Sequence, residues 1–432
     1  MRTRIFNGAV VVLAWLPVSP IVQGGEAIRK RLDNGLGVLL YPTEETQQVA
    51  LLVLYSIGDE HDPAGKCGLS HMVEHVYVTA AAGDTPARTA QEFMSKYPGK
   101  WNAQTGPDYS VFSTVFPKAQ LEDEVREAGS RMGDLRISQA NFDRERPRVL
   151  EELVNMYGWS PGVAAINHAR ERIRPMEGYR RGGVWEHIEK MTLDGVSGWW
   201  SDYYKPCNAM VILAGAFDAQ VAQELISKYF GSITPGKKVP EKRKPGPPQT
   251  GRVDVVQSPV AIGDVPAQAC IAFAAPAPGT EHYAATLLLV SRMWTMAADR
   301  SADTTVLFNI LDDPAMIAFR TQVVPDESNE NAIARIRLFI DQALTRPLHN
   351  VEPIAFRENL GAMLGVVEMP PTFIKSNLYG AAFALGRREQ LGFDSAKLGA
   401  EVEAMTRDEL QAGKEAVFGE ARQATVLVGP AK

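Results

Sequence analysis

Two histidines and a glutamate occupy five residues of an otherwise apolar stretch, GLSHMVEHVYV, which runs from Gly68 to Val78. On a helix, His71, Glu74 and His75 fall within a sector of about 100°, opposite an apolar stripe. Two imidazoles at i and i+4 can reach one metal ion, and the glutamate could take a proton from a metal-bound water. A solvated polar face that holds no ligand explains this spacing as well, so the stretch alone leaves metal binding open.

A catalytic zinc usually has three protein ligands, so a third candidate must come from another element. The segment 141–161 predicts a second helix, whose buried stripe includes Val149. Glu152 and Glu145 border that stripe on the same side, two turns apart, whereas Glu151 faces away. A carboxylate in this position is costly unless it is paired or coordinates something. Pairing with a neighbouring arginine is the alternative to metal binding.

The composition is that of a globular protein rather than a nucleic-acid-binding one. The chain has 432 residues, 45% of them hydrophobic and 22% charged, and its formal net charge is −6. A chain of this length can form two domains with cores of their own, and the negative charge favours neither nucleic acid nor an anionic membrane. The three cysteines are widely spaced and form no CxxC pair, which predicts neither a disulfide framework nor a cysteine zinc cluster (Cys67, Cys207 and Cys270).

The N-terminus has the pattern of a secretory signal peptide. Arg2 and Arg4 precede a short apolar run, residues 9–16, which prolines then interrupt. We predict a signal peptide over residues 1–24 and an exported protein with no stable membrane span once the signal is removed. An uncleaved anchor and an N-terminal core segment are the alternatives.

A Pro/Lys-rich stretch divides the rest of the chain into two similar parts. Residues 232–250 have the composition of an extended, solvated linker between residues 25–231 and 251–432. Both parts begin with strand-like sequence and end with a helix-like segment, a turn and an apolar strand. We therefore predict an α+β protein of two homologous α/β-sandwich domains, each with a mixed, largely antiparallel sheet and helices packed on it.

Several motifs, in order, resemble one known family. GLSHMVEH is similar to the inverted zinc motif of the inverzincins, the pitrilysin and insulysin type of metallopeptidase. RLDNGLGVLLYP resembles that family's opening strand, WNAQTGPDYSVF its Asn-Ala strand and ERPRVLEEL its third-ligand helix. The resemblance covers most of residues 30–230. The chain length resembles the two-domain branch, which includes mitochondrial processing peptidase and small bacterial peptidases.

The resemblance implies a Zn²⁺ site with particular roles for five residues. His71, His75 and Glu152 would be the zinc ligands. Glu74 would be the general base that activates the metal-bound water for attack on a peptide carbonyl. Glu145 would be a carboxylate that orients the site.

The resemblance also implies how a peptide substrate binds. Asn102 and Ala103 lie where the family binds the main chain of its substrate, which adds as a strand at a sheet edge. This mode reads the backbone more than the side chains. We therefore expect the substrates to be unstructured peptides.

The second part departs from the family pattern. Active members need an arginine, and a tyrosine seven residues later, that hold substrate and stabilise the oxyanion. The second part has two tyrosines, Tyr283 and Tyr379, and neither follows an arginine at that spacing. The aligned positions hold Ala298 and Thr305. The missing groups could come from a homologous partner subunit, in a heterodimer, or a homodimer could use substitute donors.

The predicted function is a zinc-dependent endopeptidase subunit in the bacterial periplasm, acting on peptides and needing a homologous partner for the Arg/Tyr pair. The alternative is a catalytically weak or inactive subunit that binds peptides or serves a structural role in a larger assembly. A redox or cofactor enzyme is disfavoured because no glycine fingerprint follows a strand.

Overall fold

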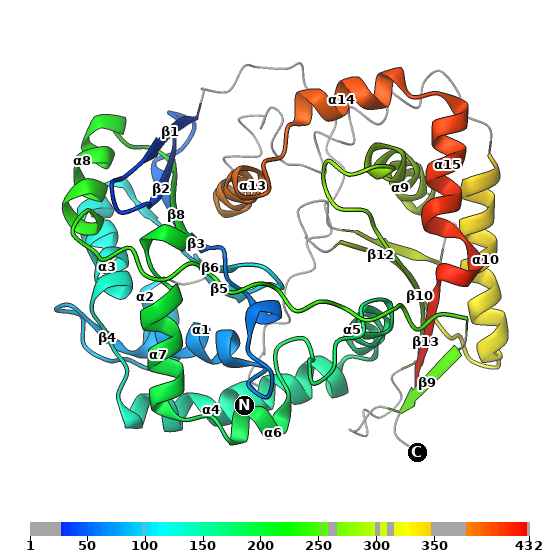
Figure 1. The fold of residues 1–432 in the computed structure, drawn as a ribbon, viewed down its shortest axis with the longest axis horizontal. Coiled ribbons are helices and arrows are strands. Elements are labelled where there is room, and N and C mark those ends of the chain that lie inside the picture. Colours follow the sequence, from blue (N-terminus) through cyan, green and yellow to red (C-terminus); the bar gives the residue numbers. More distant parts are fainter. Residues whose placement is uncertain are drawn as a thin grey trace.

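The computed structural model describes residues 27–97, 100–251, 253–257, 266–298, 303–308, 315–346 and 377–429. The predicted signal peptide lies outside these residues. The described chain forms two halves, each a β-sheet with packed helices, which confirms the expected α+β class (Figure 1). None of the described helices is both long enough and apolar enough to cross a bilayer.

The first sheet has six strands in the order β1-β2-β8-β3-β6-β5. The pairing of β2 with β8 is parallel and the other pairings are antiparallel. The central strand β3, QVALLVLY, is buried along nearly its whole length, as expected of a strand covered on both faces. The strands are β1 (Ile28–Arg31), β2 (Gly37–Pro42), β3 (Gln48–Tyr55), β5 (Trp101–Thr105), β6 (Ser110–Pro117) and β8 (Ala209–Gly215), and a separate two-stranded sheet pairs β4 (Ala81–Ala82) with β7 (Leu135–Arg136).

The second sheet repeats the first with one strand fewer. Its order is β11-β12-β10-β13-β9, and β13 pairs parallel with β9 and antiparallel with β10, as β8 does with β2 and β3. This shared topology agrees with the duplication predicted from the matching ends of the two halves. The strands are β9 (Val253–Gln257), β10 (Gln268–Ala274), β11 (Thr305–Leu307), β12 (Met316–Gln322) and β13 (Ala424–Gly429).

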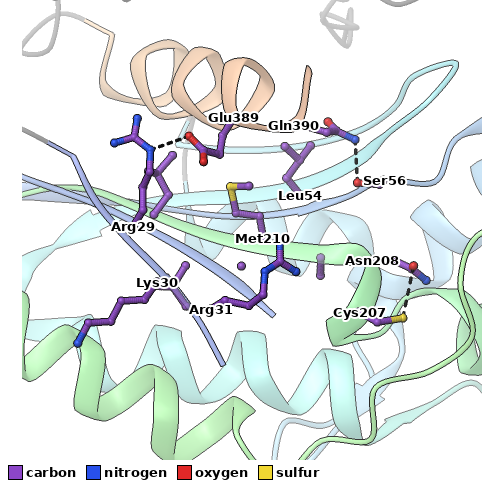
Figure 2. Close-up of a pocket in the computed structure, with 14 residues that line it drawn as sticks. Arg29, Lys30, Arg31, Leu54, Ser56, Cys207, Asn208, Met210, Glu389 and Gln390 are labelled. Carbon is purple, nitrogen blue, oxygen red and sulfur yellow. Dashed lines mark hydrogen bonds and ion pairs between the residues drawn. The ribbon is translucent and has the colours of Figure 1, made fainter. Parts of the chain in front are cut away.

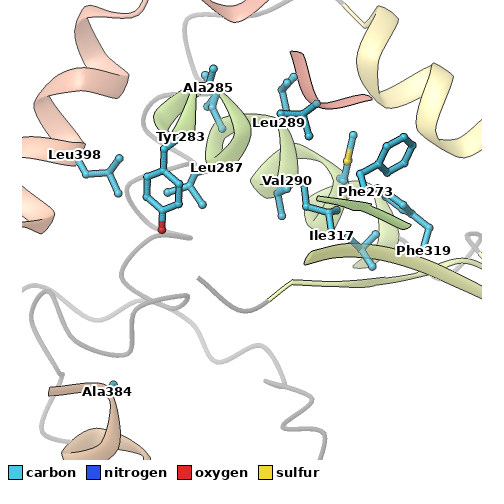
Figure 3. Packing of buried hydrophobic residues seen from close by; sticks show 14 of the residues in the cluster. Phe273, Tyr283, Ala285, Leu287, Leu289, Val290, Ile317, Phe319, Ala384 and Leu398 are labelled. Atoms are coloured by element: carbon cyan, nitrogen blue, oxygen red, sulfur yellow. The ribbon is translucent and has the colours of Figure 1, made fainter. Parts of the chain in front are cut away.

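Helices cover both sheets. In the first half they are α1 (Leu69–Thr79), α2 (Ala90–Lys96), α3 (Leu121–Gly133), α4 (Gln139–Val154), α5 (Pro161–Ile173), α6 (Trp185–Glu189), α7 (Leu193–Tyr203) and α8 (Ala219–Phe230). In the second half they are α9 (Tyr283–Ala298), α10 (Asn329–Thr345), α13 (Leu378–Leu391), α14 (Ser395–Ala404) and α15 (Arg407–Phe418). In the second half, apolar side chains of α9 meet those of β10 and β12 in a common core (Figure 3).

The two halves exchange one helix each. Helix α5 packs on β10 and β13 of the second sheet, and α13 packs on β8 and β3 of the first (Figure 1). Both helices bury small residues, which lets the helix backbone approach the sheet closely. At Gly386, a Cβ atom would lie 2.9 Å from the Ile212 side chain.

Polar contacts fix the C-terminal end of α13 on the first sheet. Arg387, which is fully buried, pairs with Asp108 at 3.1 Å, and Gln390 donates a hydrogen bond to Ser56. Arg29 of β1 pairs with Glu389, also on α13. Arg29, Ser56, Glu389 and Gln390 border a cavity of about 490 Å³ near the β1 edge of the sheet (Figure 2).

The Pro/Lys-rich linker is extended, but it is not solvated throughout. Residues 232–250 contain no helix or strand. The Arg243 amide donates to the Glu60 carbonyl and its guanidinium donates to the Pro63 carbonyl, while the Gly246 amide donates to the Pro175 carbonyl. The linker is therefore held against the first half as it leads to the second sheet.

Candidate metal centre

Helix α1, which carries the two histidines, starts at a tightly held turn. Gly68 has φ = 99°, and a Cβ atom there would lie 3.0 Å from Gly183 Cα, so the position requires glycine. The buried Asp62 carboxylate accepts hydrogen bonds from the backbone amides of Gly68, Leu69 and Ser70 at 2.8–3.0 Å. These contacts satisfy the first amides of α1 and fix the direction in which the helix leaves the turn.

The two imidazoles are held by their Nδ1 atoms, which leaves both Nε2 atoms facing the same point. His71 Nδ1 lies 2.8 Å from the carbonyl oxygen of Gly182, and because a carbonyl only accepts, Nδ1 is the donor. His75 Nδ1 lies 3.7 Å from Glu145 Oε2. Glu152 Oε2, on α4, lies 3.6 Å from His71 Nε2 and 3.3 Å from His75 Nε2.

This cluster fits a zinc ion. The ligand atoms of His71, His75 and Glu152 all lie within 4.8 Å of one another. Zinc bound tetrahedrally about 2.1 Å from each atom would separate its ligands by about 3.4 Å, close to the observed distances to Glu152. Two imidazoles and one carboxylate are also a donor set that catalytic zinc uses.

Without a metal, protons would occupy the same cluster. Burial by itself lowers the pKa of His75, but its contacts with Glu145 and Glu152 outweigh this and raise the pKa to about 10. Glu152 is half exposed, and its partial desolvation raises its pKa only in part, so the contacts with His71 and His75 hold that pKa well below its usual range. The three side chains are thus attracted to one another even when no ion is bound.

This attraction predicts a pH-dependent contribution to the stability of the metal-free protein. The pKa of His75 rises from its usual 6.5 to about 10 on folding, so its stabilising effect is complete below pH 6.5 and disappears as the pH approaches 10. Urea unfolding in excess chelator should show a gap in midpoint between wild type and His75→Gln that narrows from pH 6.5 to pH 10. A gap of constant size would contradict the prediction.

The two carboxylates of α4 differ in exposure. Glu145 is buried, as the helical projection predicts, whereas the side chain of Glu152 is 51% exposed. Glu152 lies at the border of the buried stripe of α4. Its carboxylate points toward His71 and His75 but remains partly exposed to solvent. The arginines proposed as its alternative partners contact other groups: Arg144 and Arg148 pair with Glu145, and Arg146 pairs with Asp143.

A π-helical turn, Asn155–Trp159, follows α4 directly. Such turns occur frequently at functional sites because they shift the side chains of the helix they interrupt. Here the turn connects the helix that carries Glu152 to α5, which leaves for the second sheet. The sequence pattern gave no sign of it.

Glu74 and the predicted substrate residues meet at the edge strand β5. Thr105 Oγ1 donates a hydrogen bond of 2.7 Å to Glu74 Oε2. Asn102 and Ala103 lie on the same strand, which pairs with β6 and with no other strand among the described residues. Asn102 Nδ2 donates a hydrogen bond of 2.8 Å to the hydroxyl of Tyr379, on α13. The predicted base and substrate residues are therefore on one strand or next to it.

Four residues of the site were missed by sequence reasoning. Asp62 and Gly182 orient α1 and His71, while Thr105 and Tyr379 contact Glu74 and Asn102. Thr105 follows Asn102 by three residues on the predicted strand. The alternation of side chains along a strand shows which face Thr105 lies on, but it does not show that Thr105 contacts Glu74. Tyr379 was noticed only as a tyrosine without an arginine seven residues before it.

The fold and the donor cluster together define a zinc-protease-like protein built from two sheet-and-helix halves. Comparison with protein families agrees. Residues 38–171 match the family described as insulinase (peptidase family M16), and residues 190–293 match the peptidase M16 inactive domain. The chain belongs to the M16 peptidase family.

Individual relatives are distant. The chain is 28% identical to the zinc protease PqqE of Helicobacter pylori over 226 residues, which make up 50% of this chain and 48% of PqqE. The structure of a protease from H. pylori has a TM-score of 0.74 at 20% identity and covers 94% of this chain and 100% of that one. The periplasmic protease PqqL of Escherichia coli has a TM-score of 0.71 at 15% identity and covers 95% of this chain and 48% of PqqL. The match to PqqE thus spans about half of that protein.

Proposed function

We propose that this chain is a zinc-dependent endopeptidase subunit that hydrolyses unstructured peptides. The observation that carries the proposal is the convergence of His71, His75 and Glu152 on one point, with their ligand atoms within 4.8 Å of one another. The zinc-binding half would be residues 25–231, joined by the linker 232–250 to residues 251–432.

Each residue of the site has a distinct role in the proposed reaction. Zinc bound by His71, His75 and Glu152 would polarise the scissile carbonyl and lower the pKa of a water molecule. Glu74, oriented by the Thr105 hydroxyl, takes a proton from the attacking water and passes it to the leaving amine. Glu145 holds the His75 ring in its orientation.

The peptide would bind along the edge of β5 that faces away from β6, which no described strand occupies. Its backbone would pair with the strand at Asn102 and Ala103, which extends the sheet by one strand. Such pairing needs an extended peptide and depends little on its side chains. Unstructured segments are therefore the expected substrates.

The proposed enzyme works with a homologous partner subunit that carries the Arg/Tyr pair. The aligned residues here are Ala298, exposed at the end of α9, and Thr305, at the start of β11. One chain of this kind corresponds to about half of PqqL, which supports pairing of two such units. A heterodimer is the proposed assembly, and a homodimer with substitute donors is the alternative.

We place the protein in the bacterial periplasm. Residues 1–24 have the charged start and short apolar run of a signal peptide. The fold is shared with PqqL, which is described as periplasmic.

A second function is favoured by the missing pair. A chain without an arginine and tyrosine at Ala298 and Thr305 could bind peptides without turnover, as a structural or peptide-binding subunit. The retained histidines, Glu74 and Glu152 support the peptidase instead, because they assemble the metal and the base.

Zinc content and hydrolysis of a quenched fluorescent peptide test the proposal. We expect one zinc per chain and weak hydrolysis by the chain alone, with strong hydrolysis after mixing with a homologue that carries the Arg/Tyr pair. Treatment with a chelator should remove both zinc and hydrolysis. A chain that binds no zinc, or a mixture no more active than the homologue alone, would overturn the peptidase assignment.

A further inference from the structure

Helix α13 of the second half carries a phenol to the edge strand of the first. The hydroxyl of Tyr379 accepts a hydrogen bond of 2.8 Å from Asn102 Nδ2, although the two residues are 277 positions apart. Asn102 lies on β5, the strand next to the candidate metal centre. The contact thus brings a side chain of the second half to the place where a peptide would bind.

The phenol is held in place by its own helix. The Asn377 side chain caps α13 by accepting a hydrogen bond from the Gly380 amide at 3.0 Å, which fixes the first turn, where Tyr379 lies. The Tyr379 ring is nearly parallel to that of Phe383, with ring centres 6.1 Å apart, and Phe383 packs against Tyr109 of the first half. A side chain supported in this way loses little further freedom when it contacts a ligand.

The edge strand separates Tyr379 from Glu74. Successive side chains of a strand point to opposite faces, so Asn102 and Thr105 lie on opposite faces of β5. Thr105 contacts Glu74 on one face, and Asn102 contacts Tyr379 on the other. A peptide paired along the edge of β5 that faces away from β6 would therefore pass between the carboxylate and the phenol.

The phenol is available as a donor. Burial raises the pKa of Tyr379 above its usual 10 and outweighs the opposing hydrogen bond from Asn102, while the negative charge of Glu74 adds a smaller increase, so the hydroxyl keeps its proton at neutral pH. Its oxygen accepts from Asn102, and among the described residues no acceptor is recorded for its hydrogen. The partly buried Tyr379 hydroxyl, next to the edge strand β5, can therefore still donate its hydrogen to a ligand.

We propose that Tyr379 is a catalytic residue that donates a hydrogen bond to the carbonyl oxygen of the scissile peptide bond as that oxygen gains negative charge. The inference rests on the proposed peptidase function. It assigns to α13 a contribution that the aligned position, Thr305, cannot make. The partner subunit would then be needed for its arginine and not for its tyrosine.

The test compares Tyr379→Phe with wild type in two measurements. In the zinc-loaded chain, kcat for a quenched fluorescent peptide should fall by about 10²-fold, as when one oxyanion donor is removed, and KM should rise by no more than about 10-fold. In the metal-free chain, the affinity for fluorescein-labelled, carboxymethylated insulin B chain should fall by about 2- to 10-fold, as expected from loss of one neutral hydrogen bond. Zinc content should not change.

Tyr283→Phe is the matched control, because Tyr283 lies in the core of the second half, against Phe393. This variant should keep the wild-type kcat and affinity. If Tyr379→Phe cleaves as fast as wild type while Glu74→Gln does not cleave, the Tyr379 inference fails and the peptidase function stands. If zinc-loaded wild type cleaves no faster than Glu74→Gln, the proposed function fails and the inference fails with it.

Discussion

Glu74→Gln should lower peptide hydrolysis by about 10²–10⁴-fold, the range attributed to a positioned general base. Glutamine has almost the same shape and can still accept the hydrogen bond from Thr105, so α1 and β5 should keep their contact. What it cannot do is take a proton from water. Hydrolysis of the quenched peptide, measured together with zinc content, should show lost turnover in a protein that still holds one zinc per chain.

The neighbouring acid Glu151 supplies the control for this experiment. It lies exposed on α4, beside Glu152, and takes no part in the cluster. Glu151→Gln should therefore cleave at the wild-type rate. Full activity in Glu74→Gln would mean that another group accepts the proton.

Removal of a zinc ligand should lower zinc affinity more than removal of the residue that orients this ligand. His75→Ala deletes one of the three donors, and we expect zinc affinity to fall by more than about 100-fold, with hydrolysis falling to background. Glu145→Gln leaves all three donors and only loosens the His75 ring, so its affinity should fall by about 10- to 100-fold. Competition with a chromophoric chelator at fixed pH measures both values.

The order of these two effects decides the assignment. Equal losses in His75→Ala and Glu145→Gln would indicate that the ion contacts Glu145 directly. Unchanged affinity in His75→Ala would place the metal elsewhere. Circular dichroism at the same pH would show whether either variant has lost the fold instead.

Local periodicity was sufficient to predict the elements of the candidate site. His71, Glu74 and His75 share one face because they lie on a single short helix, and the phase of Glu145 and Glu152 follows from the same 3.6-residue repeat. The 3.6-residue repeat shows only the direction in which each side chain leaves the helix. It could not show that Glu152 is half exposed, because exposure depends on what packs beside α4.

The exchanged helices could not be predicted in the same way. The small residues of α5 and α13 are compatible with close packing, but nothing in a helical repeat names the sheet on which a helix packs. The contact between Asn102 and Tyr379 depends on that choice, across 277 positions of sequence. Without the exchange, the sequence interpretation judged Tyr379 only by the absence of an arginine seven residues before it.

The exchange of α5 and α13 also constrains the order in which the chain can fold. The face of the first sheet that α13 covers stays exposed until α13, which ends at Leu391, has docked, although the last strand of that sheet ends at Gly215. A fragment that ends in the linker would leave that apolar face to water and would carry α5 without its sheet. Each half therefore needs a helix of the other to cover its sheet, and a first half on its own would be a target for chaperones.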